Sequence, residues 1–428
     1  MHIRIRRARV LVSVLFTFGA GSLPADLPAQ ERDTLLTRLT AEAVAANPSL
    51  QAGLASARAA RARIRPAGAL PDPMLSVGVM NLTLPRFGFR ESDFTEVDLE
   101  LSQEFPWPGT RDARTAQAQA EWTVRSADSR SRRREIVART AEVYYRLRYV
   151  ATARAILQQQ RRLLATAVEI ATARYATTSA PQSDPLQARV AMARLDAEDT
   201  DFAEQQARLG AELKALRHVR GSERLTIDLI CPENVRASRH RAEGTALDTD
   251  TLRTHPRIAA RQAAVEAAER TVRVEQLAAR PDFNIMTRYG ARPLGADFFS
   301  ALIGIRVPLW AGRKQSRLAD AARADADAAR AELAEETVAI EAELEAARAA
   351  VASGETRLRL LTAQVIPSAA ATVEAVLRSY RGAQAPFLNV LAAEDSLYRA
   401  QLDAVRVASE HLTHLVILEQ LLSPEVES

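Results

Sequence analysis

Cysteine is nearly absent from this chain: Cys231 is the only one among 428 residues. A disulfide within one chain is therefore excluded, and no cysteine near the start is placed to carry a lipid anchor. Paired-cysteine metal sites, phosphate-binding glycine loops and nucleophile elbows are missing as well. The closest approach to a metal site is His411 with His414 on one helix, and this pair has no further ligands at a specific spacing. We therefore expect no enzyme activity, no cofactor and no metal site.

Aromatic residues and long apolar runs are also scarce. Aromatics make up 5% of the chain, whereas Ala and Arg are abundant, which is typical of long helices rather than of a large globular core. After residue 29 there is no run of about eighteen apolar residues, so the sequence predicts no transmembrane helix.

The first 29 residues have the pattern of a secretory signal peptide. Four arginines precede a short apolar run, Val10 to Gly19, and small and turn-forming residues follow. The leader holds most of the basic excess, so the net charge falls from +4 for the whole chain to about +1 without it. This near-neutral charge argues against a nucleic-acid partner. An exported chain without a membrane helix is either soluble or part of a β-barrel.

What the sequence does contain is a duplication. Six landmarks recur in the same order about 205 residues apart; for example, Asn47-Pro48 corresponds to His255-Pro256, and Arg174-Tyr175 corresponds to Ser379-Tyr380. Such a recurrence indicates an internal repeat. We expect a first repeat, a linker, a second repeat and a short tail, at residues 30–218, 219–254, 255–422 and 423–428.

Each repeat contains two segments in which apolar and polar residues alternate, the period of a β-strand. The clearest example has Val97, Leu99 and Leu101 at odd positions and acidic residues at the even positions between them. Segments of nine or ten residues have the length of a tilted strand that crosses a bilayer, although an ordinary hairpin with one wet face has the same pattern. We expect strands at about 74–83, 95–105, 282–289 and 298–307.

Long helices follow the strands in both repeats. Between Gly109 and Arg174 there is neither proline nor glycine, and apolar residues keep the heptad spacing of a coiled-coil seam. The expected fold is therefore mainly α with a small β part, each repeat giving one β-hairpin and one long helical hairpin. The long helices are expected at about 109–175, 185–218, 312–379 and 386–422.

Three strings make this arrangement similar to the TolC-like outer-membrane efflux protein family: Leu70-Pro71-Asp72-Pro73-Met74-Leu75, Gln103-Glu104-Phe105-Pro106-Trp107-Pro108-Gly109, and the segment Tyr380 to Leu391. The middle string resembles the branch that partners heavy-metal and related resistance-nodulation-division pumps. The resemblance implies a homotrimer, with a twelve-stranded barrel in the outer membrane and a long periplasmic α-barrel. Independently, four strands in lipid leave two unpaired edges, so the sheet must close with other copies.

Roles for particular residues follow once the barrel is accepted. The polar strand positions should line its lumen: Glu96, Asp98, Glu100, Arg288 and Arg306. The turns between the long helices should form the periplasmic tip that meets an adaptor protein: Arg174, Tyr175, Thr178, Arg378, Tyr380, Arg381 and Gly382. Some family members have an acidic pore constriction after the second turn. Here the corresponding positions are Asn389 and Ala392; Glu394 and Asp395 follow and are alternative candidates, unless they belong to a solvated helix face.

The leading functional hypothesis is the passive exit duct of a tripartite efflux pump. A homotrimer in outer-membrane lipid would conduct small molecules or metal ions from an inner-membrane transporter, of the resistance-nodulation-division type, through a periplasmic adaptor protein. One alternative is the outer-membrane duct of a type I protein secretion system. Another, from a different class, is an exported coiled-coil scaffold in the periplasm, although a scaffold has no need of strands with one continuous apolar face.

Overall fold

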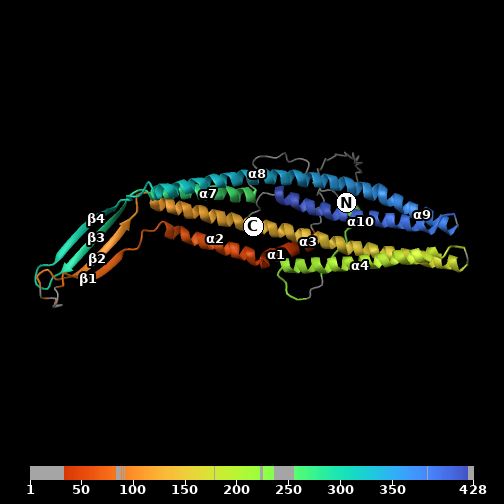
Figure 1. The fold of residues 1–428 in the computed structure, drawn as a ribbon, viewed down its shortest axis with the longest axis horizontal. Coiled ribbons are helices and arrows are strands. Elements are labelled where there is room, and N and C mark those ends of the chain that lie inside the picture. The colour runs from red at the N-terminus through yellow and green to blue at the C-terminus, as the bar shows by residue number, and fades with distance from the viewer. Residues whose placement is uncertain are drawn as a thin grey trace, which may run out of the picture.

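The computed structural model describes residues 33–422, except 83–87, 89, 91, 178, 222–224, 236–254 and 383. The expected signal peptide, most of the expected linker, the tail and Thr178 lie outside these residues. The described chain is elongated, with a small sheet at one end and long helices over the rest of its length (Figure 1).

The sheet has four antiparallel strands in the order β1-β2-β3-β4: Met74–Met80, Glu96–Phe105, Asp282–Ala291 and Phe298–Arg306. Each repeat gives one hairpin, and β2 pairs with β3 to join them, with Leu99 opposite Tyr289. β1 ends three residues before the expected boundary because Asn81 turns the chain with a φ of 57°. The Asn81 amide donates to the carbonyl of Phe94, which fixes the turn.

The first repeat contributes α1, α2, α3 and α4: Thr34–Ala46, Pro48–Ala67, Thr110–Ala176 and Ser183–Leu216. Asn47 separates α1 from α2 because a residue before proline disfavours the helical conformation, and its side chain caps α2 by accepting from the N–H of Leu50 at 3.0 Å. Gly109, with a φ of 88°, turns the chain from β2 into α3. α3 has 67 residues, about 100 Å at 1.5 Å per residue.

The second repeat contributes α7, α8, α9 and α10: Pro256–Leu277, Gln315–Leu360, Ile366–Arg381 and Phe387–Leu422. A short 3-10 turn, η1 (Pro232–Asn234), precedes them. The expected long helix 312–379 is divided, because a π-helical turn, η2 (Leu361–Val365), separates α8 from α9. Pro367 explains the interruption: it has no N–H to donate, and its ring clashes with the preceding turn of a regular α-helix.

One stretch of α8 to α9 is more apolar than the sequence prediction allowed. Within Gln315–Arg381 an 18-residue window has a mean hydropathy of 1.5, and none of it is buried inside the chain. A single apolar helix is weak evidence for a membrane span, because a helix that packs against other chains meets the same criterion.

α3 forms the centre of the helical part and packs against α1, α2, α4, α7 and α10. The core is a long seam rather than a globule, and many of its members are small. Helices therefore approach closely: a Cβ on Gly354 of α8 would lie 3.0 Å from Nδ1 of the buried His411 on α10. The main cluster contains Leu39, Val143, Tyr144, Leu157, Phe202, Leu213, Tyr380 and Phe387.

The start of α1 and the segment before η1 are both tied to α3. Asp33 accepts from the hydroxyl of Tyr144 at 2.7 Å and from Nη1 of Arg148 at 3.0 Å. Arg148 also donates to the carbonyls of Asp228 and Leu229, so one side chain holds two segments far apart in sequence.

Candidate functional site

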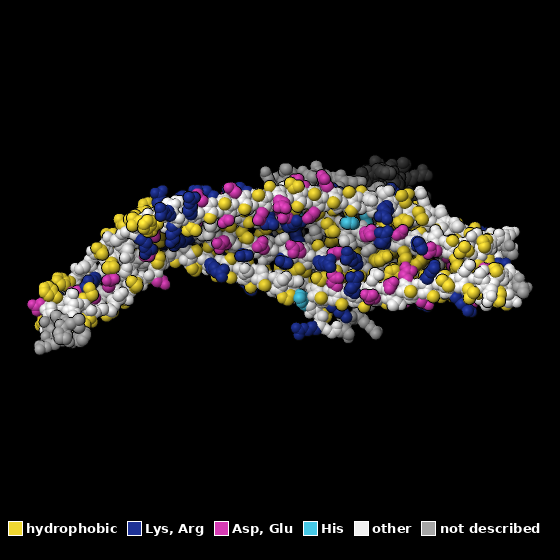
Figure 2. Space-filling view, viewed as in Figure 1, with side chains coloured by type: hydrophobic (Ala, Val, Ile, Leu, Met, Phe, Trp, Pro, Cys, Tyr) yellow, Lys and Arg dark blue, Asp and Glu magenta, His cyan; other side chains and the backbone are white. Residues whose placement is uncertain are grey.

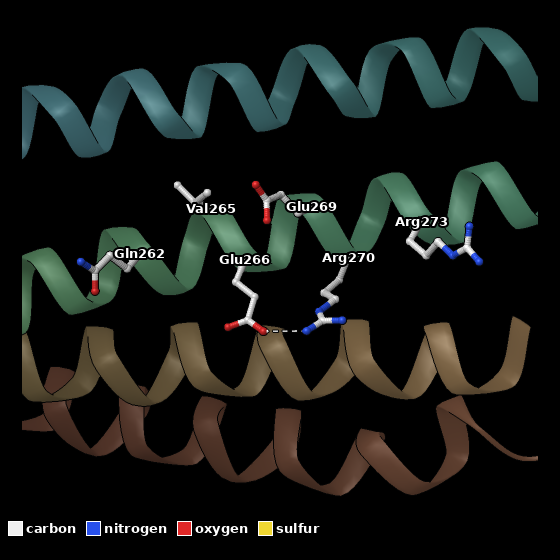
Figure 3. A pocket seen from close by; sticks show the side chains of 6 residues that line it. All are labelled: Gln262, Val265, Glu266, Glu269, Arg270 and Arg273. Carbon is white, nitrogen blue, oxygen red and sulfur yellow. Dashed lines mark hydrogen bonds and ion pairs between the residues drawn. The ribbon is translucent and has the colours of Figure 1, made fainter. Parts of the chain in front are cut away.

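The hollows found in the described part of the chain are open and shallow, not enclosed ligand sites. The best-formed hollow, of about 540 Å³, is lined by Gln262, Val265, Glu266, Glu269, Arg270 and Arg273, all from α7 (Figure 3). Glu266 and Arg270 pair with each other at 3.1 Å, so this is the surface of one helix rather than a built pocket. The described residues also contain no group of three or more His, Cys, Asp or Glu side chains able to hold a metal. The candidate functional regions are therefore the sheet and the helical tip.

The even-numbered strand positions place the predicted lumen residues on one face of the sheet. Arg288 donates through Nε to Asp98 at 2.9 Å and through Nη2 to Glu96, and its Cα lies opposite that of Glu100. Arg306 donates to both carboxylate oxygens of Glu104 at 2.7 and 2.9 Å. The predicted lumen residues did not include Glu104. Its even-numbered position in the same strand could have identified it. This face joins the acidic strand of one repeat to the basic positions of the other.

The opposite face of the sheet is apolar and exposed. Large side chains at odd positions are 45% to 73% accessible in the single chain: Val77, Leu99, Leu101, Tyr289, Phe299, Ile303 and Ile305. An exposed apolar surface of this extent indicates contact with lipid or protein, and strands with alternating apolar and polar faces are typical of transmembrane barrels. The two edges, β1 and β4, have no partner strand among the described residues.

At the other end of the molecule, the turns of the two helical hairpins lie side by side (Figure 1). Arg174, at the end of α3, places its guanidinium 4.4 Å from the ring centre of Tyr380 and donates to the Tyr380 carbonyl at 2.5 Å. The Tyr380 hydroxyl donates to Asp184 of α4 at 3.2 Å, and its ring packs on Phe387 at 5.2 Å. We call these four residues the tip latch, because they join α3 and α4 to α9 and α10.

Three of the four tip-latch residues are buried and Arg174 is half-buried, and the electrostatics of the latch follow from that burial. Tyr380 is 2% exposed and Asp184 is 6% exposed. Desolvation, followed by the neighbouring Asp184 carboxylate, raises the pKa of Tyr380. Asp184 and Phe387 were missed by the sequence prediction; their only signal was their position immediately after the two turns.

The other predicted tip residues are not part of the latch. Tyr175 is 44% exposed, and Arg378, Arg381 and Gly382 are also exposed. Arg378 lies 3.8 Å from Glu374, with both side chains largely in solvent, so the pair constrains neither of them strongly. The predicted tip set thus divides into two inward residues, Arg174 and Tyr380, and an outward group.

The predicted constriction residues divide in a similar way. Asn389, Ala392 and Asp395 are exposed, and Asp395 pairs with Arg399 at 2.9 Å. Glu394 differs from the expectation of a pore-lining or solvated side chain, because it is 5% exposed. It lies four residues from the buried Val390 and from the buried Tyr398, on the packed stripe of α10. Its Oε2 has no hydrogen-bond partner among the described residues, and burial raises the pKa of Glu394 to about 7.

Comparison with known proteins agrees with this architecture. Residues 39–217 match the model of the outer membrane efflux protein family. A search of curated protein sequences gave no match.

Three solved structures illustrate the structural similarity. The outer membrane protein VceC from Vibrio cholerae has 21% sequence identity and a TM-score of 0.76, covering 91% of this chain and 96% of VceC. CusC, whose structures concern transmembrane channel formation, has 15% identity and a TM-score of 0.78, covering 92% and 93%. The open MtrE outer membrane channel from Neisseria gonorrhoeae has 17% identity and a TM-score of 0.73, covering 90% and 88%.

These matches confirm the expected fold class, mainly α with a transmembrane β part. They also confirm the resemblance found in the sequence. The family consists of transport channels rather than enzymes. Residues 39–217 thus match the outer membrane efflux protein family, and the chain as a whole has the fold of these solved outer membrane channels.

Proposed function

We propose that three copies of this chain form the exit channel of a tripartite efflux pump. A periplasmic adaptor protein would open the channel at the tip, and an inner-membrane transporter of the resistance-nodulation-division type would deliver small molecules or metal ions to it. The observation that carries the proposal is the sheet with two different faces: one side is apolar, the other is ion-paired, and neither edge has a partner strand in the part of the chain that the structure describes.

The unpaired edges support assembly. An edge strand in hydrocarbon exposes N–H and C=O groups that no water can satisfy, so β1 and β4 need partner strands. Pairing β4 of one copy with β1 of the next removes both edges, and three copies give twelve strands. The ion-paired face then lines the lumen and the apolar face meets lipid.

The lumen wall supports passive conduction rather than ligand binding. Arg288 and Arg306 already neutralise Glu96, Asp98 and Glu104 within one chain. Glu100 lies opposite Arg288 in the register and forms no ion pair within 4 Å among the described residues. A wall with most of its charges paired offers a cargo few fixed partners.

The tip latch supports gating at the periplasmic end. Breaking its contacts would free the end of the α9–α10 hairpin from the ends of α3 and α4, while α10 stays packed on α3 farther from the tip. We propose that the outward tip residues, Tyr175, Arg378, Arg381 and Gly382 together with Thr178, meet the adaptor and that adaptor docking releases the latch. The exposed Asn389, Ala392 and Asp395, one to two turns along α10, would face the narrowed pore, whereas Glu394 would act inside the helix packing.

Purification from outer membranes, followed by measurement of the assembled mass and of single-channel conductance in planar bilayers, tests the proposal. A trimer with conductance that rises when Asp184→Asn weakens the latch is the expected result. A monomer that is soluble in the periplasm and forms no channels would refute the duct and favour the scaffold hypothesis.

The adaptor contact requires a separate experiment. Arg378→Glu with Arg381→Glu should weaken co-purification with the adaptor while leaving the trimer intact. Arg357→Glu with Arg359→Glu, exposed on α8 away from the tip, is the matched control. Unchanged co-purification in the tip variant would contradict the assignment.

A further inference from the structure

We propose that the connection between β4 and α8 binds anionic phospholipid headgroups in the periplasmic leaflet of the outer membrane. We define the junction surface as Leu309, Trp310, Arg313, Lys314 and Arg317. The proposal rests on the membrane-spanning position of the strands and does not depend on the pump, the adaptor or the cargo.

The junction surface continues the lipid-facing side of β4. Ile303, Ile305 and Val307 are 73%, 58% and 59% exposed, and beyond the strand end Leu309 and Trp310 are 80% and 70% exposed. Strands of nine or ten residues span a hydrocarbon layer when tilted, so the residues directly after Arg306 lie at headgroup level. Trp is the residue most typical of this level, since its ring is apolar and its N–H is polar.

The connection is compact, which keeps the basic residues close to the membrane boundary. The N–H of Ala311 donates to the carbonyl of Pro308 at 3.1 Å. The N–H groups of Arg313 and Lys314 both donate to the carbonyl of Trp310, at 3.0 and 2.9 Å. These bonds close successive turns between the end of β4 and the start of α8, so the connection is not extended.

The equivalent connection of the first repeat packs its tryptophan against the sheet of the same chain. The ring of Trp107 stacks on Phe283 with ring centres 5.9 Å apart, and the backbone N–H of Trp107 donates to the Asp282 carboxylate at 3.0 Å. Trp107 is therefore engaged in packing within the chain. Trp310 makes no ring contact among the described residues, so its exposure calls for a partner outside the chain.

The charge of the junction surface indicates what that partner is. Arg313 and Lys314 are exposed and have no carboxylate within 4 Å among the described residues, and Arg317 lies 3.7 Å from Asp320 with its side chain 79% exposed. Lys and Arg side chains gather where the sheet meets the helices (Figure 2). Basic residues at headgroup level attract anionic lipid, each by about fivefold in the association constant at low salt. An anionic phospholipid can place its headgroup against the basic residues and its acyl chains against Leu309 and Trp310. It therefore matches both the charged and the apolar part of the junction surface.

Native mass spectrometry of the detergent-solubilised protein, titrated with phosphatidylglycerol or phosphatidylcholine, tests the proposal. We expect preferential binding of phosphatidylglycerol, and a loss of about tenfold or more in its affinity in the triple variant Arg313→Gln, Lys314→Gln, Arg317→Gln. The matched control changes three exposed arginines of the same helix farther from the sheet, Arg323→Gln, Arg357→Gln and Arg359→Gln, and should retain the wild-type affinity. Equal losses in both variants would overturn the proposal.

Two further readouts separate lipid from other occupants. Inorganic phosphate at millimolar concentration should not displace phosphatidylglycerol. Displacement would show that the junction surface binds anions in general, and would overturn the lipid proposal. If a neighbouring copy covers the surface instead, the triple variant will dissociate into monomers while lipid binding per chain stays unchanged, and the proposal fails. Single-channel conductance should persist in the triple variant, so a failure of lipid binding is distinguishable from a failure of the duct hypothesis.

Trp310 itself reports where the surface lies. The chain has three tryptophans, so Trp107→Phe with Trp122→Phe leaves Trp310 as the only one. In vesicles that contain phosphatidylglycerol with brominated acyl chains, its fluorescence should be quenched strongly. An unquenched Trp310 would place the junction surface away from the bilayer and overturn the proposal.

Discussion

Tyr175 and Tyr380 occupy equivalent places in the two repeats, yet one is 44% exposed and the other 2%. Trp107 and Trp310 differ in the same manner at the opposite end of the helices, but there the first repeat holds the packed residue and the second the exposed one. In each pair one residue stabilises the chain and the other remains on the surface. Duplication therefore produced equivalent positions in the two repeats, and the residues around each position determined whether it is buried or exposed.

The long helices differ between the repeats as well. α3 continues for 67 residues without interruption, whereas Pro367 and the π-helical turn divide α8 from α9. α3 contacts most of the other helices, so a break in it would disturb the whole bundle. In the second repeat α8, η2 and α9 all pack against α10, which therefore spans the break.

The largest expected effect tests the two tyrosines against each other. Tyr380→Ala should lower the local free energy of unfolding of the tip by about 3–5 kcal/mol, the cost of deleting a buried aromatic side chain. Tyr175→Ala should cost about 0.5 kcal/mol or less, because the side chain is largely exposed. Hydrogen exchange of the amides in α9 and the start of α10 measures both. Similar exchange rates in the two variants would show that burial in the single chain does not govern the tip.

A pH effect of somewhat smaller size is expected from Glu394. Burial raises its pKa from 4.5 to about 7, so between these values the folded state binds more protons than the unfolded state. The local stability of the tip of the second repeat should therefore fall as the pH rises through this window, by about 3 kcal/mol in all. Hydrogen exchange of α10 at pH 5 and pH 8 measures the effect, and Glu394→Gln should remove it. A pH dependence that survives in Glu394→Gln belongs to another group.

The two tryptophans provide the next comparison. Trp107→Ala removes a stacked, half-buried ring and should destabilise the protein by about 1–2 kcal/mol. Trp310→Ala should leave the thermal midpoint in detergent nearly unchanged, since its side chain is 70% exposed. Thermal unfolding of the two variants in neutral detergent distinguishes these outcomes. Equal destabilisation would mean that Trp310 packs against a neighbouring copy.

The smallest effect concerns the two arginines of the lumen face. Arg288→Gln removes the positive charge that neutralises two carboxylates, whereas Arg306→Gln leaves only Glu104 unpaired. Both variants should shift the reversal potential in a salt gradient toward cation preference, and Arg288→Gln should shift it more. A shift toward anions in either variant would argue that this face does not line the pore.

Several features were readable from the sequence because they depend on neighbours along the chain. The alternation at residues 96–102 predicted both a strand and its apolar face. The π-helical turn was missed, although Pro367 was visible, because a proline does not specify whether a helix bends, ends or adds a residue. The resemblance to the efflux family was also local, carried by short strings near the turns.

The tip was much less predictable. Arg174 and Tyr380 were both assigned to it, but their contact joins residues 206 positions apart, and Asp184 and Phe387 were not identified. Glu394 was expected at a pore or in solvent, and its burial reflects which face of α10 meets other helices. Helical periodicity groups residues into faces, but it does not reveal which neighbour covers each face.

The sequence by itself therefore determined the duplicated order of strands and long helices, since hydrophobic period, proline and glycine act through local geometry. Only the tertiary structure decided which member of each duplicated pair is buried, how β2 of one repeat pairs with β3 of the other, and which side chains form the tip latch. The physical reason is that burial and strand pairing depend on surfaces that come together from about two hundred residues apart in the sequence. The same residue type is buried where another element covers its face and exposed where none does.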